Sequence, residues 1–176
     1  MEHEAGRRCE PPFWGVVWPA ARALSHCLRS GAIDVRGASV LEIGCGGAAA
    51  AIAAKLAGAR SVRANDLDPA ARSVARANAL ANGVVLDLDD RDLTHLDRLP
   101  ASDLILIADF FYEATTAHRL HVLLQAARAR GTSIVLADGG RTFFPRERLA
   151  LVAQATLAVD PAIEGTHERT VRVWAW

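Results

Sequence analysis

The chain has no excess of positive charge and no long apolar run, and each absence excludes a kind of partner. Twenty Lys and Arg residues balance 20 Asp and Glu residues, so the chain lacks the broad basic footprint of a protein that grips nucleic acid. The longest apolar run, residues 48–54, ends at Lys55 and is far shorter than the ~20 residues of a membrane span. We therefore expect neither a nucleic-acid partner nor a membrane.

Cysteine is also scarce. Cys9, Cys27 and Cys45 are odd in number and widely spaced, and they form neither a CxxC pair nor a zinc pattern with histidine. The first residues, MEHEAGRRCEPPF, have no apolar segment of the secretory type. These features predict a reduced, cytoplasmic protein without a bound metal. Residues 1–10 are expected to be disordered.

The length of 176 residues, 51% of them hydrophobic, is that of one globular domain, and we expect a single domain over residues 1–176. Patterns of strands and helices alternate along it. Strands are expected over residues 39–43, 61–65, 84–88, 104–107, 133–137, 157–159 and 170–174. Helices are expected from Pro19 to a stop at Gly31, from the alanine-rich segment to Gly58, from Pro69 to Ala81, from Thr115 to Arg130 and from Pro145 to about Ala155.

Most of these strands are continuous apolar runs, which are typical of parallel strands covered on both faces. No helix pattern separates the last two strands, so these should pair antiparallel. The sequence thus predicts an α/β fold: a Rossmann-like, mostly parallel seven-stranded sheet with helices on both faces and an antiparallel C-terminal strand.

A glycine turn follows the first strand. Gly44-Cys45-Gly46 allows a ligand to approach the backbone closely, and the next helix offers free N–H groups. Together with Ala49 the turn also fits the dinucleotide pattern G-x-G-x-x-A. Glu42 decides against that reading, because a negative charge suits the cationic sulfonium of S-adenosylmethionine better than a pyrophosphate. The chain also lacks room for the second domain of a dehydrogenase.

Acidic residues follow the second and third strands. Asp66 comes about 20 residues after the glycines, where a carboxylate reaches ribose hydroxyls, and Leu67 beside it is assigned to the cofactor too. Asp68 precedes Pro69 and is expected to cap the helix. Asp92 could accept a hydrogen bond from the adenine amino group, with Leu93 against the ring; a solvated acidic loop is the alternative.

Five segments carry a resemblance to a known family: VLEIGCG, NDLDP, DLILIADFFYE, PPFWGVVWPAARAL and LADGGRTFFPRERL. They resemble the class I, seven-strand methyltransferases that use S-adenosylmethionine. Within these the chain is most similar to the protein lysine methyltransferases of the electron-transfer-flavoprotein β-subunit type. The resemblance runs from about Pro11 to the C-terminus, and residues 109–112 match the family's D-x-x-Y motif.

The resemblance implies roles for individual residues. Trp18 would contact the cofactor, residues 44–46 would hold its methionine end, and Ala108 would lie near its methyl group. Asp109 and Tyr112 would face the acceptor, and Glu113 is either part of the same motif or an acid of the next helix's first turn. The chain departs from the family pattern at Ala48, which replaces the third glycine of G-x-G-x-G, and in the length of the segment before PPFW, which is longer in the family.

Several of these residues also have structural interpretations. Trp14 is expected to be a core anchor, whereas Trp18 has a physical reason to line a sulfonium pocket, because a cation over an indole gains about 0.5–2 kcal/mol. Turn capping is the alternative for Asp109. His118 and His121 lie one helical turn apart, but without a visible third ligand they indicate a solvated helix face. Cys45 has no partner that could act as its base.

The predicted activity is S-adenosylmethionine-dependent N-methylation of a lysine in a protein like the electron-transfer-flavoprotein β-subunit, by a monomer. Methyl transfer needs a neutral amine, and a lysine of pKa about 10.4 is neutral only about 0.04% of the time at pH 7. Because a carboxylate stabilises an ammonium, Asp109 is assigned to binding and orienting the amine.

Two alternatives stay open: a small-molecule, nicotinamide-type N-methyltransferase, and a non-catalytic S-adenosylmethionine-binding module. An adenine methyltransferase of nucleic acid is disfavoured, because residues 108–112 lack a D/N-P-P-Y loop.

Overall fold

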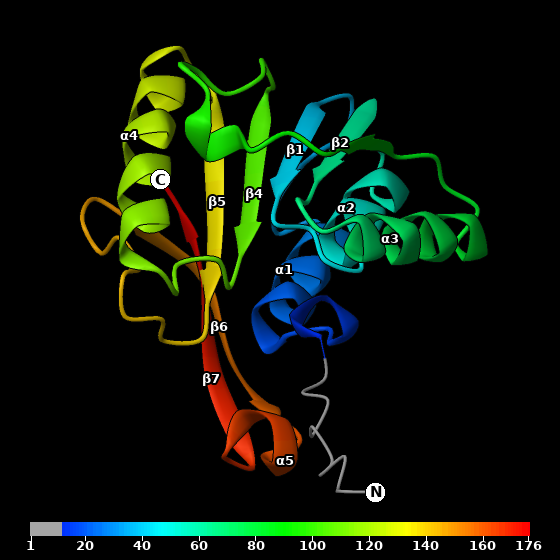
Figure 1. Ribbon diagram of the computed structural model, residues 1–176, viewed down its shortest axis with the longest axis vertical. Coiled ribbons are helices and arrows are strands. Elements are labelled where there is room, and N and C mark those ends of the chain that lie inside the picture. Colours follow the sequence, from blue (N-terminus) through cyan, green and yellow to red (C-terminus); the bar gives the residue numbers. More distant parts are fainter. Residues whose placement is uncertain (1–11) are drawn as a thin grey trace, which may run out of the picture.

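The computed structural model describes residues 12–176, so the predicted disorder of residues 1–10 and Cys9 lie outside it. One sheet runs through the molecule, with the strand order β3-β2-β1-β4-β5-β7-β6 (Figure 1). The strands are β1 (Ser39–Ile43), β2 (Ser61–Asn65), β3 (Asp87–Asp89), β4 (Leu104–Ala108), β5 (Ser133–Asp138), β6 (Ala150–Ala158) and β7 (Glu168–Ala175). The helices are α1 (Pro19–Arg29), α2 (Ala49–Leu56), α3 (Pro69–Ala81), α4 (Ala114–Ala129) and α5 (Pro161–Glu164), with short 3₁₀ turns η1 (Phe13–Gly15) and η2 (Leu93–His95).

The pairing of the strands confirms the predicted fold class. Strands β1 to β5 are parallel to one another, whereas β7 runs antiparallel to both β5 and β6. The chain leaves β1 toward β2 and β3 on one side and returns to β4 and β5 on the other. The order of the strands therefore reverses between β1 and β4, and in open α/β sheets ligands bind at the carboxyl ends of such strands.

Helices cover both faces of the sheet. Helices α1, α2 and α3 pack on one face, where their buried alanines and leucines meet residues such as Val40 and Leu106. Helix α4 packs on the other face against Ile105 and Leu136, and the two sides are separated by the sheet in Figure 1. Alternate residues of β4 thus feed two hydrophobic cores, which explains why its sequence is a continuous apolar run.

The helix predicted from Pro145 to about Ala155 is wrong. The segment from Ala150 onward is the edge strand β6, which pairs with β7 from Ala150 opposite Ala175 to Ala158 opposite Glu168. Alanine and leucine favour helices intrinsically, but exposed and half-buried side chains alternate along most of this segment. Pairing with β7 overrides the propensity, because strand formation depends mainly on neighbouring strands.

The third strand begins later than predicted, at Asp87 instead of Val84. The N–H group of Val84 donates to the carbonyl of Ala79 and so closes the C-terminus of α3. Gly83, with φ of +65°, makes the left-handed turn that this closure needs. The first residues of the expected strand are therefore used to end the preceding helix.

Candidate functional site

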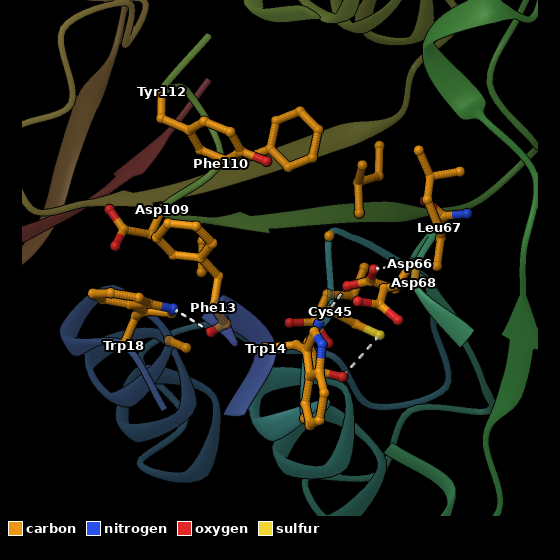
Figure 2. A pocket seen from close by; sticks show the side chains of 18 of the residues that line it. Phe13, Trp14, Trp18, Cys45, Asp66, Leu67, Asp68, Asp109, Phe110 and Tyr112 are labelled. Carbon is orange, nitrogen blue, oxygen red and sulfur yellow. Dashed lines mark hydrogen bonds between the residues drawn. The ribbon is translucent and has the colours of Figure 1, made fainter. Parts of the chain in front are cut away.

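A cavity of about 580 Å³ lies at the carboxyl ends of β1, β2 and β4. Figure 2 shows part of its wall, with Trp18 and Asp109 at one end and Asp66 and Asp68 at the other. The cavity is thus where the reversal of strand order places it. Of the residues assigned to a site from the sequence, all but Glu113 line it: Trp18, Glu42, Gly44, Cys45, Gly46, Asp66, Leu67, Asp92, Leu93, Ala108, Asp109 and Tyr112.

The glycine turn forms the floor of the cavity. Gly44 and Gly46 have φ of +69° and +50°, a left-handed conformation that favours glycine. A Cβ atom on Gly44 would lie 2.6 Å from Cδ2 of Phe110, so the ring of Phe110 packs directly on the bare backbone. The N–H group of Gly46 donates to Oδ2 of Asp66 at 2.8 Å. The turn and the acidic loop after β2 therefore support each other.

Ala48 adopts the conformation of the glycine that it replaces. Its φ of +61° and ψ of +35° are left-handed, and it precedes the first residue of α2. Its N–H group donates to the carbonyl of Cys45 at 2.7 Å. The turn thus forms with an alanine at this position, at the cost of the ~1–2 kcal/mol that an L-residue spends in this conformation.

Ala48→Gly should therefore cost less than a glycine elsewhere in this core. Relief of about 1–2 kcal/mol of strain is offset by the entropy that the unfolded chain gains and by the loss of a methyl group that is fully buried, so we expect the free energy of unfolding to stay within about 0.5 kcal/mol of the wild type and Tm within about 2 °C by thermal unfolding. The matched control is Ala53→Gly, in the interior of α2, which should cost about 1 kcal/mol. Equal destabilisation by both changes would contradict the strain.

Asp66 occupies the position expected for a ribose ligand. Besides Gly46, its carboxylate accepts from the N–H group of Asp68 at 3.0 Å. Arg72 holds the same loop from outside by donating to the carbonyls of Asp66 and Leu67, each at 2.8 Å. Asp68 accepts from the N–H group of Ala70 and caps α3, as predicted.

Glu42 is buried, with 2% of its surface exposed. Its Oε2 accepts from the N–H group of Ala51 in the first turn of α2 at 2.8 Å. Burial, with a smaller contribution from the nearby charge of Asp66, raises the pKa of Glu42 to about 8, against the opposing effect of the Ala51 hydrogen bond. The site therefore holds a carboxyl group that favours its neutral form until a cation approaches.

Asp92 is engaged locally. Its carboxylate accepts from the N–H group of Thr94 at 3.0 Å and from its hydroxyl at 2.6 Å, and its other oxygen meets Nδ1 of His95 at 2.7 Å. These hydrogen bonds lower the pKa of Asp92. Leu93, beside it, is 2% exposed and belongs to the core that packs against α4. Asp92 is thus a capping residue whose carboxylate also reaches the cavity wall.

Cys45 is not an activated thiol. Burial raises its pKa well above the usual range, and the carboxylates of Glu42 and Asp66 add to the effect. A thiolate is the nucleophilic form, so this environment works against covalent catalysis. The surroundings of Cys45 therefore agree with a buried structural residue and not with a nucleophile.

Two tryptophans form one wall of the cavity. Trp18 donates from Nε1 to the carbonyl of Phe13 at 2.8 Å, and the guanidinium of Arg141 lies 5.5 Å from the centre of its ring. The cation that lies over the Trp18 indole in this structure is therefore the guanidinium of Arg141. Trp14 was expected in the core, but it is only half-buried and lines the cavity. Its backbone packs on Gly46 of the glycine turn.

Asp109 is tightly held. Its φ of +57° is left-handed, and its two carboxylate oxygens accept from Nε and Nη2 of Arg141 at 2.8 and 2.7 Å. Its N–H group donates to the carbonyl of Ala137 on β5. A strained backbone that fixes a charged side chain at a cavity edge is typical of functional positions.

The other two residues of the predicted acceptor side differ in their surroundings. The Tyr112 side chain lines the cavity and is largely exposed. Glu113 accepts from the N–H groups of Thr115 and Thr116 at 2.9 and 2.6 Å, which caps α4. The hydrogen bonds of Thr116 and Thr115 lower the pKa of Glu113 to about 2. Of the two interpretations of Glu113, its geometry supports the helix acid.

Some residues of the site were not predicted from the sequence. Phe110 covers the glycine turn, His95 and Thr116 line the cavity, and Arg141 binds Asp109. Arg141 could have been found, since Asp138-Gly-Gly-Arg141 ends a parallel strand next to β4. No sequence pattern pointed to the rings of Phe110 and His95, because their positions depend on the turns that carry them.

Across residues 12–176 we find no group of three or more His, Cys, Asp or Glu side chains arranged to hold a metal ion. No helix in that same range is long and apolar enough to cross a membrane. His121 stacks on Trp176 with ring centres 5.0 Å apart, and His118 is exposed.

Known proteins share this fold and sequence. The model of the ribosomal protein L11 methyltransferase family matches residues 24–109. Among solved structures, magnesium protoporphyrin IX methyltransferase of Synechocystis PCC 6803, with bound S-adenosylmethionine, superposes with a TM-score of 0.61 at 16% identity and covers 88% of this chain and 77% of that one. That likeness shows the fold.

Sequence relatives show the family. The electron transfer flavoprotein beta subunit lysine methyltransferase of Xenopus laevis is 41% identical over 171 residues, which are 94% of this chain and 69% of that protein. The rat protein of the same name is 35% identical over 169 residues, which are 93% of this chain and 66% of that protein. The chain spans about two thirds of the length of these relatives. It belongs to the family of electron transfer flavoprotein β-subunit lysine methyltransferases, within the class I methyltransferases.

Proposed function

We propose that the chain binds S-adenosylmethionine in the cavity and transfers its methyl group to a lysine of an electron-transfer-flavoprotein β-subunit. The observation that carries the proposal is the charge of the wall. The described residues that line the cavity include no Lys or Arg and five carboxyl groups: Glu42, Asp66, Asp68, Asp92 and Asp109. Of these, Glu42 favours its neutral form until a cation approaches, and Asp109 is paired with Arg141 from outside the cavity, so Asp66, Asp68 and Asp92 carry most of the negative charge. Such a wall attracts a cationic cofactor and repels the pyrophosphate of a dinucleotide.

The residues present fit this cofactor. Asp66 lies beside the glycine turn and can accept from ribose hydroxyls, and Glu42 lies under the turn where a sulfonium and an amino group would be balanced by its charge. The bare backbone of Gly44 and Gly46 leaves room for the methionine end. Leu67 and Leu93 offer apolar surface beside Asp92 for an adenine ring.

When bound, S-adenosylmethionine supplies an electrophilic methyl group on a positive sulfur. The protein must deliver a neutral lysine amine in line with it, which costs about 4.6 kcal/mol at pH 7 for an unperturbed lysine. Asp109 and Tyr112 line the cavity and orient the amine, and the aromatic side chains of the wall reduce its contact with water. The amine lone pair forms the new C–N bond, the C–S bond breaks, and the product ammonium loses a proton to water.

The proposal predicts that purified electron-transfer-flavoprotein β-subunit gains methyl groups on lysine from methyl-labelled S-adenosylmethionine, as measured by mass spectrometry. Calorimetry should show binding of S-adenosylmethionine and none of NADH, because the wall is acidic. Nicotinamide-type amines serve as competing acceptors. Methylation of those amines alone would favour a small-molecule enzyme, and cofactor binding without any transfer would favour a non-catalytic module.

The setting in the cell is also part of the proposal. Cys27 and Cys45 are buried free thiols, which supports a reducing compartment such as the cytoplasm. A protein substrate and a monomeric enzyme complete the proposal. Size-exclusion chromatography with light scattering tests the monomer.

A further inference from the structure

Arg141 and Asp109 form an ion pair with two hydrogen bonds between the main cavity and a small pocket beside it. Nε and Nη2 of Arg141 donate to separate oxygens of Asp109 at 2.8 and 2.7 Å. The Asp109 side chain is 8% exposed and that of Arg141 35%. Asp109 lines both hollows, whereas Arg141 lines only the small one. The carboxylate therefore meets the main cavity with a guanidinium at its back.

The guanidinium is held from two further directions. The ring of Trp18 lies 5.5 Å from it, and Figure 2 shows Trp18 next to Asp109 at the same end of the cavity. Asp138 accepts at Oδ2 from the N–H groups of Gly140 and Arg141 at 2.6 and 2.9 Å, which fixes the turn that carries Arg141. Arg141 is thus fixed by contacts to its backbone, to the face of its guanidinium and to the N–H groups of its guanidinium.

The other ionisable groups near the Arg141–Asp109 pair do not neutralise Asp109. Asp138 on β5 has Oδ1 buried with no hydrogen-bond partner among residues 12–176, and burial raises its pKa. Glu164 of α5 and Arg169 of β7 line the small pocket and bind each other at 2.8 Å. On the main-cavity side, the titratable groups are Glu42, Cys45, Asp66, Asp68, Asp92, His95 and Tyr112. None of these groups donates a hydrogen bond to Asp109 among the described residues, so Arg141 sets its charge balance.

An unpaired carboxylate at this position would oppose the reaction. An opposite charge within about 4–6 Å raises the pKa of an amine by about 1–3 units, and the attacking lysine must be neutral. A carboxylate bonded to a guanidinium forms a pair of no net charge that still has lone pairs to accept from the amine. The oxygens can then orient the amine without stabilising its protonated form.

We propose that Arg141 is a positioning residue that masks the charge of Asp109, so that the substrate amine is oriented by the carboxylate and yet enters the reaction neutral. This inference rests on the proposed function. It gives the Asp138-Gly-Gly-Arg141 turn a part in the reaction, through Asp109, without contact with the reacting atoms.

The test compares the pH dependence of kcat for the wild type and for Arg141→Met, with saturating methyl donor and electron-transfer-flavoprotein β-subunit. We expect kcat of Arg141→Met to fall about tenfold at pH 7.5 and to recover toward pH 10, because the rise of the profile moves up by about one pH unit. In the double variant Arg141→Met/Asp109→Asn the rise should return to near the wild-type pH, although the rate stays low. Arg169→Met is the matched control, since Arg169 has the same 35% exposure and a similar ion pair but does not touch Asp109; its profile should match the wild type.

Two results would overturn the inference. A uniform loss of kcat at every pH would show that Arg141 does not affect the protonation of the substrate amine. A lower KM with a higher kcat at pH 7.5 would show that Arg141 blocks the amine and has to leave.

A binding measurement separates this inference from the proposed function. Sinefungin carries a primary amine where the cofactor carries its S-methyl group, so its affinity relative to S-adenosylhomocysteine reports how the site treats a cationic amine. Calorimetry at pH 7.5 should show this ratio about tenfold higher in Arg141→Met than in the wild type and in Arg169→Met. An unchanged ratio overturns the masking role even if the protein methylates no β-subunit, whereas a raised ratio without methylation would count against the substrate alone.

Discussion

Asp109→Asn should lower the rate of methyl transfer by about 10²-fold or more while cofactor affinity stays within a few-fold of the wild type. The change keeps the shape of the side chain, removes its charge and replaces one of its two acceptor oxygens by an NH₂ group, so the amine is oriented less well, and losses of this size are usual for a positioning contact. It also leaves the guanidinium of Arg141 without its charged partner. Single-turnover transfer to the β-subunit measures the rate, and calorimetry measures the affinity.

The pH profile of Asp109→Asn adds an independent test. If the carboxylate only orients the amine, the rate of the variant should still rise with pH as lysine deprotonates, whereas a general base would make the wild-type profile level off near its own pKa. Glu113→Gln is the matched control, because that carboxylate caps α4 and does not line the cavity. Full activity in Asp109→Asn would move the acceptor contact to Tyr112.

The part of the cavity around the glycine turn could be predicted better than the part around Asp109, and the reason is local. The positions of Gly44, Gly46 and Asp66 follow from two consecutive strand-turn-helix units, and neighbouring parallel strands bring their carboxyl ends together. The structure shows the same turn and joins Gly46 to Asp66 by a hydrogen bond. Here short-range sequence patterns and the sheet order suffice.

The part of the cavity around Asp109 depends on contacts between distant segments. Arg141 is 32 residues from Asp109 in the chain, and its guanidinium also lies on Trp18, far upstream. The position of β6 depends in the same way on pairing with β7, which overrode the helix propensity of its alanines. For Glu113 the sequence left two roles open, and the geometry of the α4 cap is what separates them.

Glu42→Gln should change the pH dependence of stability more than any other substitution of a cavity carboxylate. The unfolded chain has a glutamate pKa of about 4.3, and burial raises the pKa of Glu42 to about 8 in the folded protein. Between these values the folded state binds the proton more tightly, so the wild type loses stability as pH rises through this window, and the loss is complete above about pH 8. Glutamine keeps an oxygen for the N–H group of Ala51 and cannot ionise.

We therefore expect the free energy of unfolding of Glu42→Gln to exceed that of the wild type at pH 9 by on the order of 3–5 kcal/mol and to be similar at pH 5, as measured by urea unfolding without cofactor. Groups that titrate in both proteins cancel in the difference. Glu113→Gln is again the control: its folded pKa is lowered to about 2, so the stability that it contributes is lost only in acid and its difference from the wild type should be flat from pH 6 to 9. The same flat difference for Glu42→Gln would show that Glu42 is already ionised in the empty site. With the shift in place, binding of cationic S-adenosylmethionine at pH 7 should draw the proton from Glu42, which calorimetry in buffers of different ionisation enthalpy detects as proton release that Glu42→Gln abolishes.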